Sequence, residues 1–244
     1  MTQVKHSSRW RVWHRWLSLV FGVQMVLWSI SGAYMVFFDI DYIHGDHLIK
    51  DIASPVAPTT ELASIDAVLA KYPHSQSIEL ETRWLNNQNV PVYHVTGHQG
   101  ERVLDAQSLE PIVFSKQDIE ALAVRYYALE DPAVASIVYL TDEAPSELNP
   151  KLLPIWQVNF DDFGSTSFYL SETSGELLVK RHTFWRGFDI FWMIHIMDYE
   201  DRVDIETWWL QGFIIGTFLL MITGVVLLFF TISFKRKPKQ GESA

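Results

Sequence analysis

Histidine is the main residue type in this 244-residue chain that can hold a metal or a cofactor. The chain contains nine histidines and no cysteine. The absence of cysteine excludes a disulfide scaffold, an iron–sulfur cluster, a thiolate zinc site, a nucleophilic thiol and covalent attachment of a c-type haem. A bound metal or haem must therefore be held by histidine, methionine, tyrosine or carboxylate side chains.

The first candidate, His14, lies at the edge of a long apolar stretch, among Trp10, Trp13 and Trp16. An ionisable side chain at this depth is a functional candidate by default, because a charge near hydrocarbon is costly. The alternative is an interfacial histidine that helps the neighbouring arginines to anchor the helix end. The residues alone leave both interpretations open.

A second candidate, His195, belongs to the aromatic segment 184–199, FWRGFDIFWMIHIMDY. Phe188, Phe191 and His195 follow each other at helical spacing, so His195 continues an apolar stripe on one face. A haem pocket needs an axial nitrogen and flat apolar walls, which such a face provides. The alternative is a histidine that only packs in a core or at an interface.

His44 and His47 follow the first apolar stretch, in the sequence IHGDH. With Asp46 they could contribute to a divalent metal site, although such a site needs a fourth ligand from elsewhere. We favour a different role, in which His44 approaches His195 and completes bis-histidine ligation of haem iron. A solvated loop is the third interpretation.

The other histidines are expected to be structural or solvated, including His94 and His98, which flank a predicted hairpin turn. The chain has no Ser-His-Asp order, phosphate-binding loop or dinucleotide glycine fingerprint.

Two uncharged stretches, residues 16–38 and 208–234, predict transmembrane helices. At about 1.5 Å per residue, each covers the roughly 30 Å of a bilayer's hydrocarbon core. The first stretch exceeds the apolar region of about 7–15 residues in a signal peptide, and no small-residue cleavage site follows it. We therefore expect an uncleaved span.

Charge is distributed in blocks and predicts the orientation of both spans. Basic residues gather at both chain ends, whereas residues 39–207 hold 28 acidic and 11 basic residues. The positive-inside rule places both termini in the cytoplasm and the acidic region outside, which in a bacterial inner membrane is the periplasm. The acidic region also argues against nucleic acid as a partner, since it repels phosphate.

The central region predicts an α+β fold with an internal repeat. Each unit has a helix, at 60–72 or 116–127, followed by short β-like runs. Pro91–Val95 aligns with Pro154–Val158 at an offset of 63, and the last strands align at an offset near 66. A sheet face of this kind needs its helix as a cover. The predicted segments are a basic N-terminus at 1–15, a span at 16–38, an outward domain at 39–181, an interfacial amphipathic helix and turn at 182–207, a span at 208–234 and a basic tail at 235–244.

The end of the second unit, with Ile155-Trp-Gln-Val and Ser174-Gly-Glu-Leu-Leu, resembles a PepSY domain. The first unit is similar to a divergent copy: it keeps Asp105 but has Leu109 where the motif has glycine, and the second unit has Ser171 where the motif has aspartate. The outward domain is thus expected to be two PepSY-like helix-plus-antiparallel-sheet units.

The flanking segments, including His14-Arg-Trp-Leu-Ser-Leu-Val and the later Ser-Gly and Thr-Gly pairs, resemble the PepSY-associated transmembrane helix family. In that family the His-Arg-Trp position is associated with b-type haem, so the resemblance implies haem b and a role for His14 as an iron ligand. Larger relatives have four or more spans, which implies that a partner completes the membrane core of this chain.

His14 and His195 are expected at opposite membrane faces, roughly 30 Å apart, so they cannot bind one iron within a subunit. We therefore expect a homodimer in lipid, with His14 facing its twofold-related copy. The predicted function is a b-type haem protein that transfers electrons at or across the inner membrane to iron or another outward acceptor, with an unidentified redox partner. The alternatives are a non-enzymatic regulator of a periplasmic peptidase and a docking subunit of a membrane complex.

Overall fold

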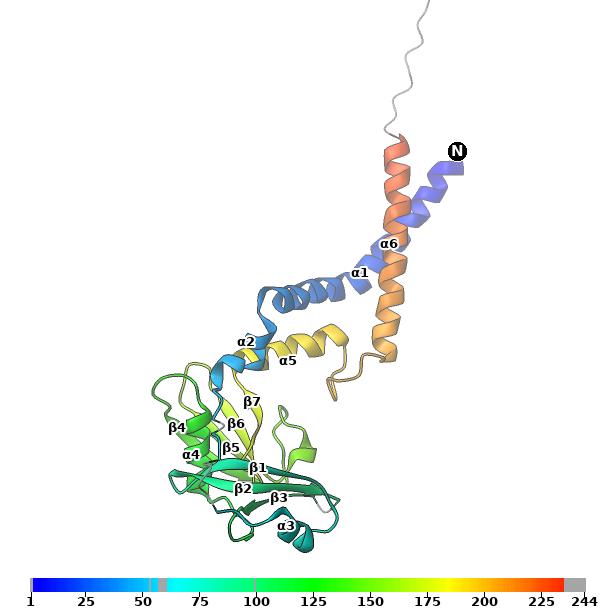
Figure 1. The fold of residues 1–244 in the computed structure, drawn as a ribbon. Coiled ribbons are helices and arrows are strands. Elements are labelled where there is room, and N and C mark those ends of the chain that lie inside the picture. Colours follow the sequence, from blue (N-terminus) through cyan, green and yellow to red (C-terminus); the bar gives the residue numbers. More distant parts are fainter. Residues whose placement is uncertain (1, 53, 57–60, 99, 235–244) are drawn as a thin grey trace, which may run out of the picture. The chain divides into compact units, whose positions relative to one another are not determined.

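The computed structural model describes residues 2–52, 54–56, 61–98 and 100–234. The predicted basic tail at 235–244 lies outside these residues. The chain divides into two compact units, residues 1–39 with 187–244, and residues 40–186. It is mixed helix and antiparallel sheet, as predicted (Figure 1).

The first unit contains two helices that are long and apolar enough to cross a membrane. They are α1 (Thr2–Phe37) and α6 (Trp208–Phe234), whose apolar parts run over Ser8–Phe37 and Trp208–Ile232. The two helices pack through the ring of Phe21, which lies where any side chain at Gly216 would have to be. The same ring meets Phe213 edge-on, with centroids 5.3 Å apart. Only glycine at position 216 allows this approach.

A shorter helix, α5 (Thr183–Ile196), packs along α1 from Gly187 onward. Tyr34 of α1 contacts Phe191, with ring centroids 4.7 Å apart, and its hydroxyl lies 3.2 Å from a Cβ placed on Gly187. The aromatic stripe predicted for this helix is therefore the face that contacts α1.

The second unit contains two antiparallel sheets, each covered by a helix. It begins with α2 (Ile40–His44) and a short 3-10 helix, Asp46–Leu48. The first sheet has the order β1-β2-β3 and the second β4-β5-β6-β7. The remaining elements are α3 (Ile65–Lys71), β1 (Ser75–Leu85), β2 (Gln88–Gly97), β3 (Gly100–Asp105), α4 (Lys116–Tyr126), β4 (Val134–Leu140), a 3-10 helix (Pro150–Leu152), β5 (Ile155–Phe160), β6 (Ser167–Ser171) and β7 (Leu177–Arg181).

The pairing of strands confirms the internal repeat. Val92 pairs with Asp105 in the first sheet, and Ile155 pairs with Ser171 in the second. These pairs are related by the two offsets that the sequence predicted, 63 and 66.

The turn after each of these pairs is also the same. Asp105 Oδ1 accepts from the backbone N–H groups of Gln107 and Ser108, and Ser171 Oγ accepts from those of Thr173 and Ser174. Both turns end on a residue with positive φ, Leu109 at 59° and Gly175 at 68°. Serine can therefore replace aspartate here, because either side chain offers the oxygen that the turn needs.

One boundary differs from the sequence prediction. The first repeat's helix was predicted to begin at 60, but α3 begins at Ile65, because Ser64 caps it by accepting from Ala67 N at 3.2 Å. The stretch 61–64 is therefore not helical. After the turn that follows β6, the last strand, β7, pairs with β6.

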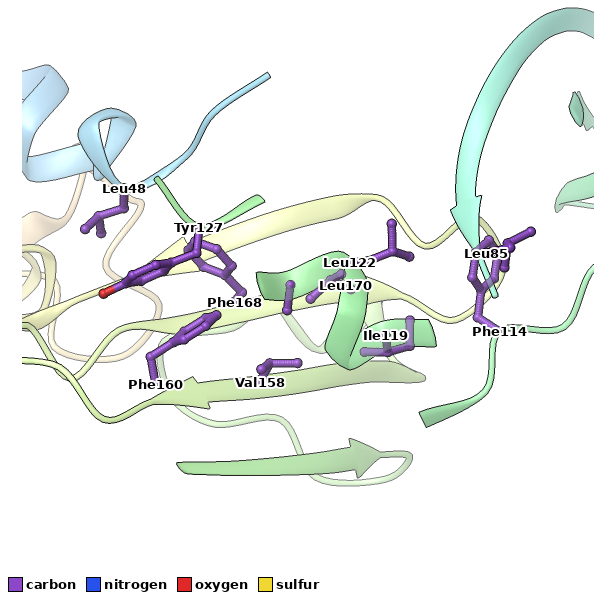
Figure 2. Packing of buried hydrophobic residues seen from close by; sticks show 11 residues of the cluster. Leu48, Leu85, Phe114, Ile119, Leu122, Tyr127, Val158, Phe160, Phe168 and Leu170 are labelled. Carbon is purple, nitrogen blue, oxygen red and sulfur yellow. The ribbon is translucent and has the colours of Figure 1, made fainter. Parts of the chain in front are cut away.

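The largest core lies between α4 and the second sheet (Figure 2). Ile119 and Leu122 of α4 face Val158 and Phe168 on the strands, and all four side chains are fully buried. The helix begins in a capping box formed by Ser115 and Asp118, so its start and its apolar face are both encoded locally.

Phe168→Ala should lower the free energy of unfolding by about 3–5 kcal/mol, because it leaves a cavity where α4 covers the sheet. Phe163→Ala is the matched control. Phe163 is 99% exposed, so its loss should change that free energy by less than about 0.5 kcal/mol. Denaturant unfolding followed by circular dichroism measures both, and equal effects would contradict this description of the core.

Candidate functional site

His14 makes a defined contact with the second long helix. Its Nδ1 lies 2.9 Å from Thr223 Oγ1, and its Cε1 lies 3.3 Å from a Cβ placed on Gly224. The Thr223 hydroxyl donates its one proton to Leu220 O at 2.7 Å, so it accepts from His14 Nδ1–H. The network thus assigns the proton of a neutral His14 ring to Nδ1 and leaves the Nε2 lone pair available.

His195 makes the same contact with α1. Its Nδ1 lies 2.8 Å from Ser31 Oγ, and its Cε1 lies 3.8 Å from a Cβ placed on Gly32. Ser31 Oγ donates to Leu27 O at 2.8 Å, so it too accepts from a histidine Nδ1–H. A neutral His195 ring therefore also keeps its Nε2 lone pair.

These contacts explain why a Ser-Gly pair in one long helix matches a Thr-Gly pair in the other. In each pair the hydroxyl orients a histidine ring and the glycine leaves room for it. We call His14 with Thr223 and Gly224 the His14 site, and His195 with Ser31 and Gly32 the His195 site. The sequence showed the repeated pair but did not indicate that each one contacts a histidine.

Two further polar side chains of α1 hold the end of α5. Gln24 Nε2 donates to Ile194 O at 3.2 Å, and Trp28 Nε1 donates to His195 O at 2.8 Å. The last carbonyl groups of a helix have no partner within it, so these bonds satisfy two of them. Gln24, the one strongly polar residue in the uncharged stretch 16–38, is 6% exposed and serves this purpose.

The His14 and His195 sites lie far apart along α1. Ser31 comes 17 residues after His14 in this helix, which corresponds to about 25 Å at 1.5 Å per residue. His14 and His195 thus belong to the same unit but are too far apart to form one site. This agrees with the expectation that they cannot bind a single iron atom.

An open apolar groove runs beside the His14 site, with a volume of about 750 Å³. His14, Met25 and Trp28 of α1 form one side, and Phe218, Gly224 and other residues of α6 form the other. Binding sites for flat organic cofactors are mostly apolar with few polar groups. This groove, with one histidine at its edge, has that character.

His44, the third predicted ligand, lies in the second unit at the end of α2 and is exposed. Its neighbour in sequence, His47, stacks on Tyr42 with ring centroids 4.2 Å apart. His182, which the sequence analysis treated as structural or solvated, is 2% exposed, and its Nε2–H donates to Ile43 O at 3.0 Å. The ring centroids of His47 and His182 are 5.5 Å apart.

The pKa values of His47 and His182 both lie below the ordinary value of 6.5. Burial is the main cause for each ring, and each is further lowered by a nearby positive charge, from His182 on His47 and from Arg186 on His182. Both rings are therefore neutral at pH 7, where each can pack against its aromatic neighbours.

Because these two pKa values are lowered on folding, the unfolded chain binds more protons below about pH 6.5. The unfolding temperature should be constant above pH 7 and should fall as the pH decreases from 6.5 toward 5. His47→Gln should make this fall less steep. Thermal unfolding at half-unit pH steps measures it, and identical slopes for the variant and the wild type would contradict the assignment.

No protein-family model, curated protein or solved structure matches this chain.

Proposed function

We propose that this protein is a b-type haem protein of the membrane that transfers electrons, with His14 and His195 as iron ligands. One observation carries the proposal. Two histidines, His14 on α1 and His195 on α5, each donate Nδ1–H to a hydroxyl of another helix, which leaves Nε2 of each ring as the free lone pair. Metal-ligating histidines are typically oriented in this way by a hydrogen bond from the other ring nitrogen.

The residues around His14 fit a haem group. The groove beside His14 is almost entirely apolar and has room for a flat macrocycle, and Gly224 opens the space next to the imidazole. When bound, haem supplies one-electron chemistry at its iron. Thr223 and Ser31 keep the imidazole rings oriented, and the apolar side chains keep water away from them.

A single chain offers one histidine to the His14 site among its described residues, because α6 contains no histidine. A second copy can supply the other ligand, so we include a homodimer in the proposal. Gly22 of α1 and Gly212 of α6 support it, since a Cβ on either would meet no atom within 4 Å. Small residues on an open helix face allow close approach of another helix in a bilayer.

The proposal also includes the resemblance to PepSY domains and an inner-membrane location, with both termini in the cytoplasm and the central domain in the periplasm. Two apolar helices that flank a domain of two sheets are compatible with this topology. The acidic charge of the central region favours the outward side. Electrons would then pass from a donor at one face to iron or another acceptor at the other.

Protein purified in detergent should show reduced-minus-oxidised bands of b-type haem. His14→Ala and His195→Ala should each lower the ratio of haem to protein, because each removes one iron ligand. His98→Ala is the control, since His98 is exposed in the turn between β2 and β3. The measurement is the pyridine haemochrome content per chain. A wild type without these bands would overturn the proposed function, and full haem retention in His14→Ala would overturn that ligand assignment.

Thr223→Val and Ser31→Ala should weaken haem binding by about 10–100-fold, as is usual when the hydrogen bond that orients a ligand is lost. The chain offers matched controls. Thr231 and Ser29 are exposed, and each donates to the carbonyl four residues earlier in the same helices. Thr231→Val and Ser29→Ala should therefore leave affinity unchanged. Haem transfer to an excess of an apo-haemoprotein measures affinity, and equal transfer from Ser31→Ala and Ser29→Ala would contradict the positioning role.

A further inference from the structure

A second cluster of potential metal ligands lies in the unit formed by residues 40–186. Glu81 of β1 and His94 of β2 are diagonal neighbours on the first sheet, where His94 pairs with Glu79 and Glu81 pairs with Val92. Glu176 comes from the turn between β6 and β7 of the second sheet. One ligand atom from each residue lies within 4.8 Å of the other two. The cluster therefore joins the two repeat units.

The distances within the cluster suit a shared ion better than a hydrogen bond. His94 Nδ1 lies 3.3 Å from Glu81 Oε1. In the part of the chain that the structure describes, this buried oxygen has no hydrogen-bond partner. Two ligands of one metal ion, each about 2.1 Å from it, lie about 3.0–3.4 Å apart. A buried carboxylate oxygen without a partner is costly, and a cation would satisfy it.

The other nitrogen of His94 faces a further carboxylate. Its Nε2 is buried and lies 3.4 Å from Glu101 Oε1 of β3. In metal sites, the second ring nitrogen of a ligating histidine is usually directed at a carboxylate or carbonyl group, which fixes the tautomer and raises the basicity of the ligand. His94 has this environment, with Glu81 at one nitrogen and Glu101 at the other.

Arg83 holds the two carboxylates of different repeats next to each other. Its guanidinium donates to Glu81 Oε2 at 2.7 Å and to Glu176 Oε1 at 2.5 Å, and its Nε donates to Ser174 O at 3.1 Å. Glu81 thus keeps Oε1 free on the side of His94. With Glu101, the cluster holds three carboxylates and one guanidinium, so its net charge is negative and favours a cation.

We propose that Glu81, His94 and Glu176 bind a divalent transition-metal ion, with Glu101 orienting His94 and Arg83 positioning the carboxylates. One imidazole and two carboxylates are ligands that Zn²⁺, Fe²⁺ and Mn²⁺ accept, whereas Mg²⁺ and Ca²⁺ prefer oxygen alone. The ion would link the first sheet to the turn of the second. This site is independent of haem and of the proposed function.

The test is binding of Zn²⁺ to the full-length protein in detergent. A chelator first removes any bound metal, and isothermal titration calorimetry then measures the affinity for Zn²⁺. We expect one strong site per chain that is absent from His94→Gln and Glu81→Gln, with a loss of affinity of at least about tenfold. His98→Gln is the matched control, because His98 is exposed in the turn that follows β2. The zinc-bound wild type should also unfold at a higher temperature than the zinc-free protein.

Circular dichroism in zinc-free buffer checks that each variant is folded. If His94→Gln is not folded, Glu176→Gln provides the same comparison from a surface turn. A wild type that binds no Zn²⁺, or a His94→Gln variant that binds it as the wild type does, would overturn the proposal. The cluster would then be an ion-pair network between His94 and the glutamates. Equal loss of zinc in His14→Ala would instead place the ion at the His14 site and would also overturn the proposal.

Discussion

A polar side chain on an apolar helix is stabilised by a partner within the protein, because little water is available there. Several such side chains of α1 and α6 have one, although Thr217 Oγ1 does not. This constraint organises the unit that contains α1 and α6. Ser31 and Thr223 satisfy a histidine ring as well as their own helix, and Gln24 and Trp28 satisfy the open end of α5. The bonds of the two histidine rings, of Gln24 and of Trp28 each join two helices, so together they define how α5 and α6 lie along α1.

The same constraint determines the chemistry of the two histidines. A hydroxyl that has already donated its proton to its own helix can only accept, so a neutral ring beside it must present Nδ1–H. His14 and His195 are thereby held with Nε2 available. Nothing in a sequence states this directly, because the effect depends on a carbonyl four or three residues earlier and on a ring from another helix.

Local patterns explain what the sequence could predict. The sequence predicted a helix at 116–127, where α4 lies, and the two offsets aligned the strands of both repeats, since these features involve residues close together in the chain. The contacts that join distant segments were missed. Glu176 reaches Arg83 across 93 residues, and Ser31 reaches His195 across 164. In the sequence, His94 looked like part of an ordinary hairpin. Its carboxylate neighbours come from other segments: Glu81 and Glu101 from the strands on either side, and Glu176 from the other repeat.

The two histidine sites have the same local contacts but are formed by different pairs of helices. The His14 site joins two helices that can both cross a membrane, whereas the His195 site joins α1 to the shorter α5. Both sites nevertheless include α1, since His14 and Ser31 belong to that helix. A twofold axis along paired α1 helices would therefore bring the two copies of each site toward each other. In the proposed dimer, α1 thus sets the spacing between the two sites. Pairing α1 with its copy is also the simplest way for a chain with two spans to supply a second ligand at the His14 site.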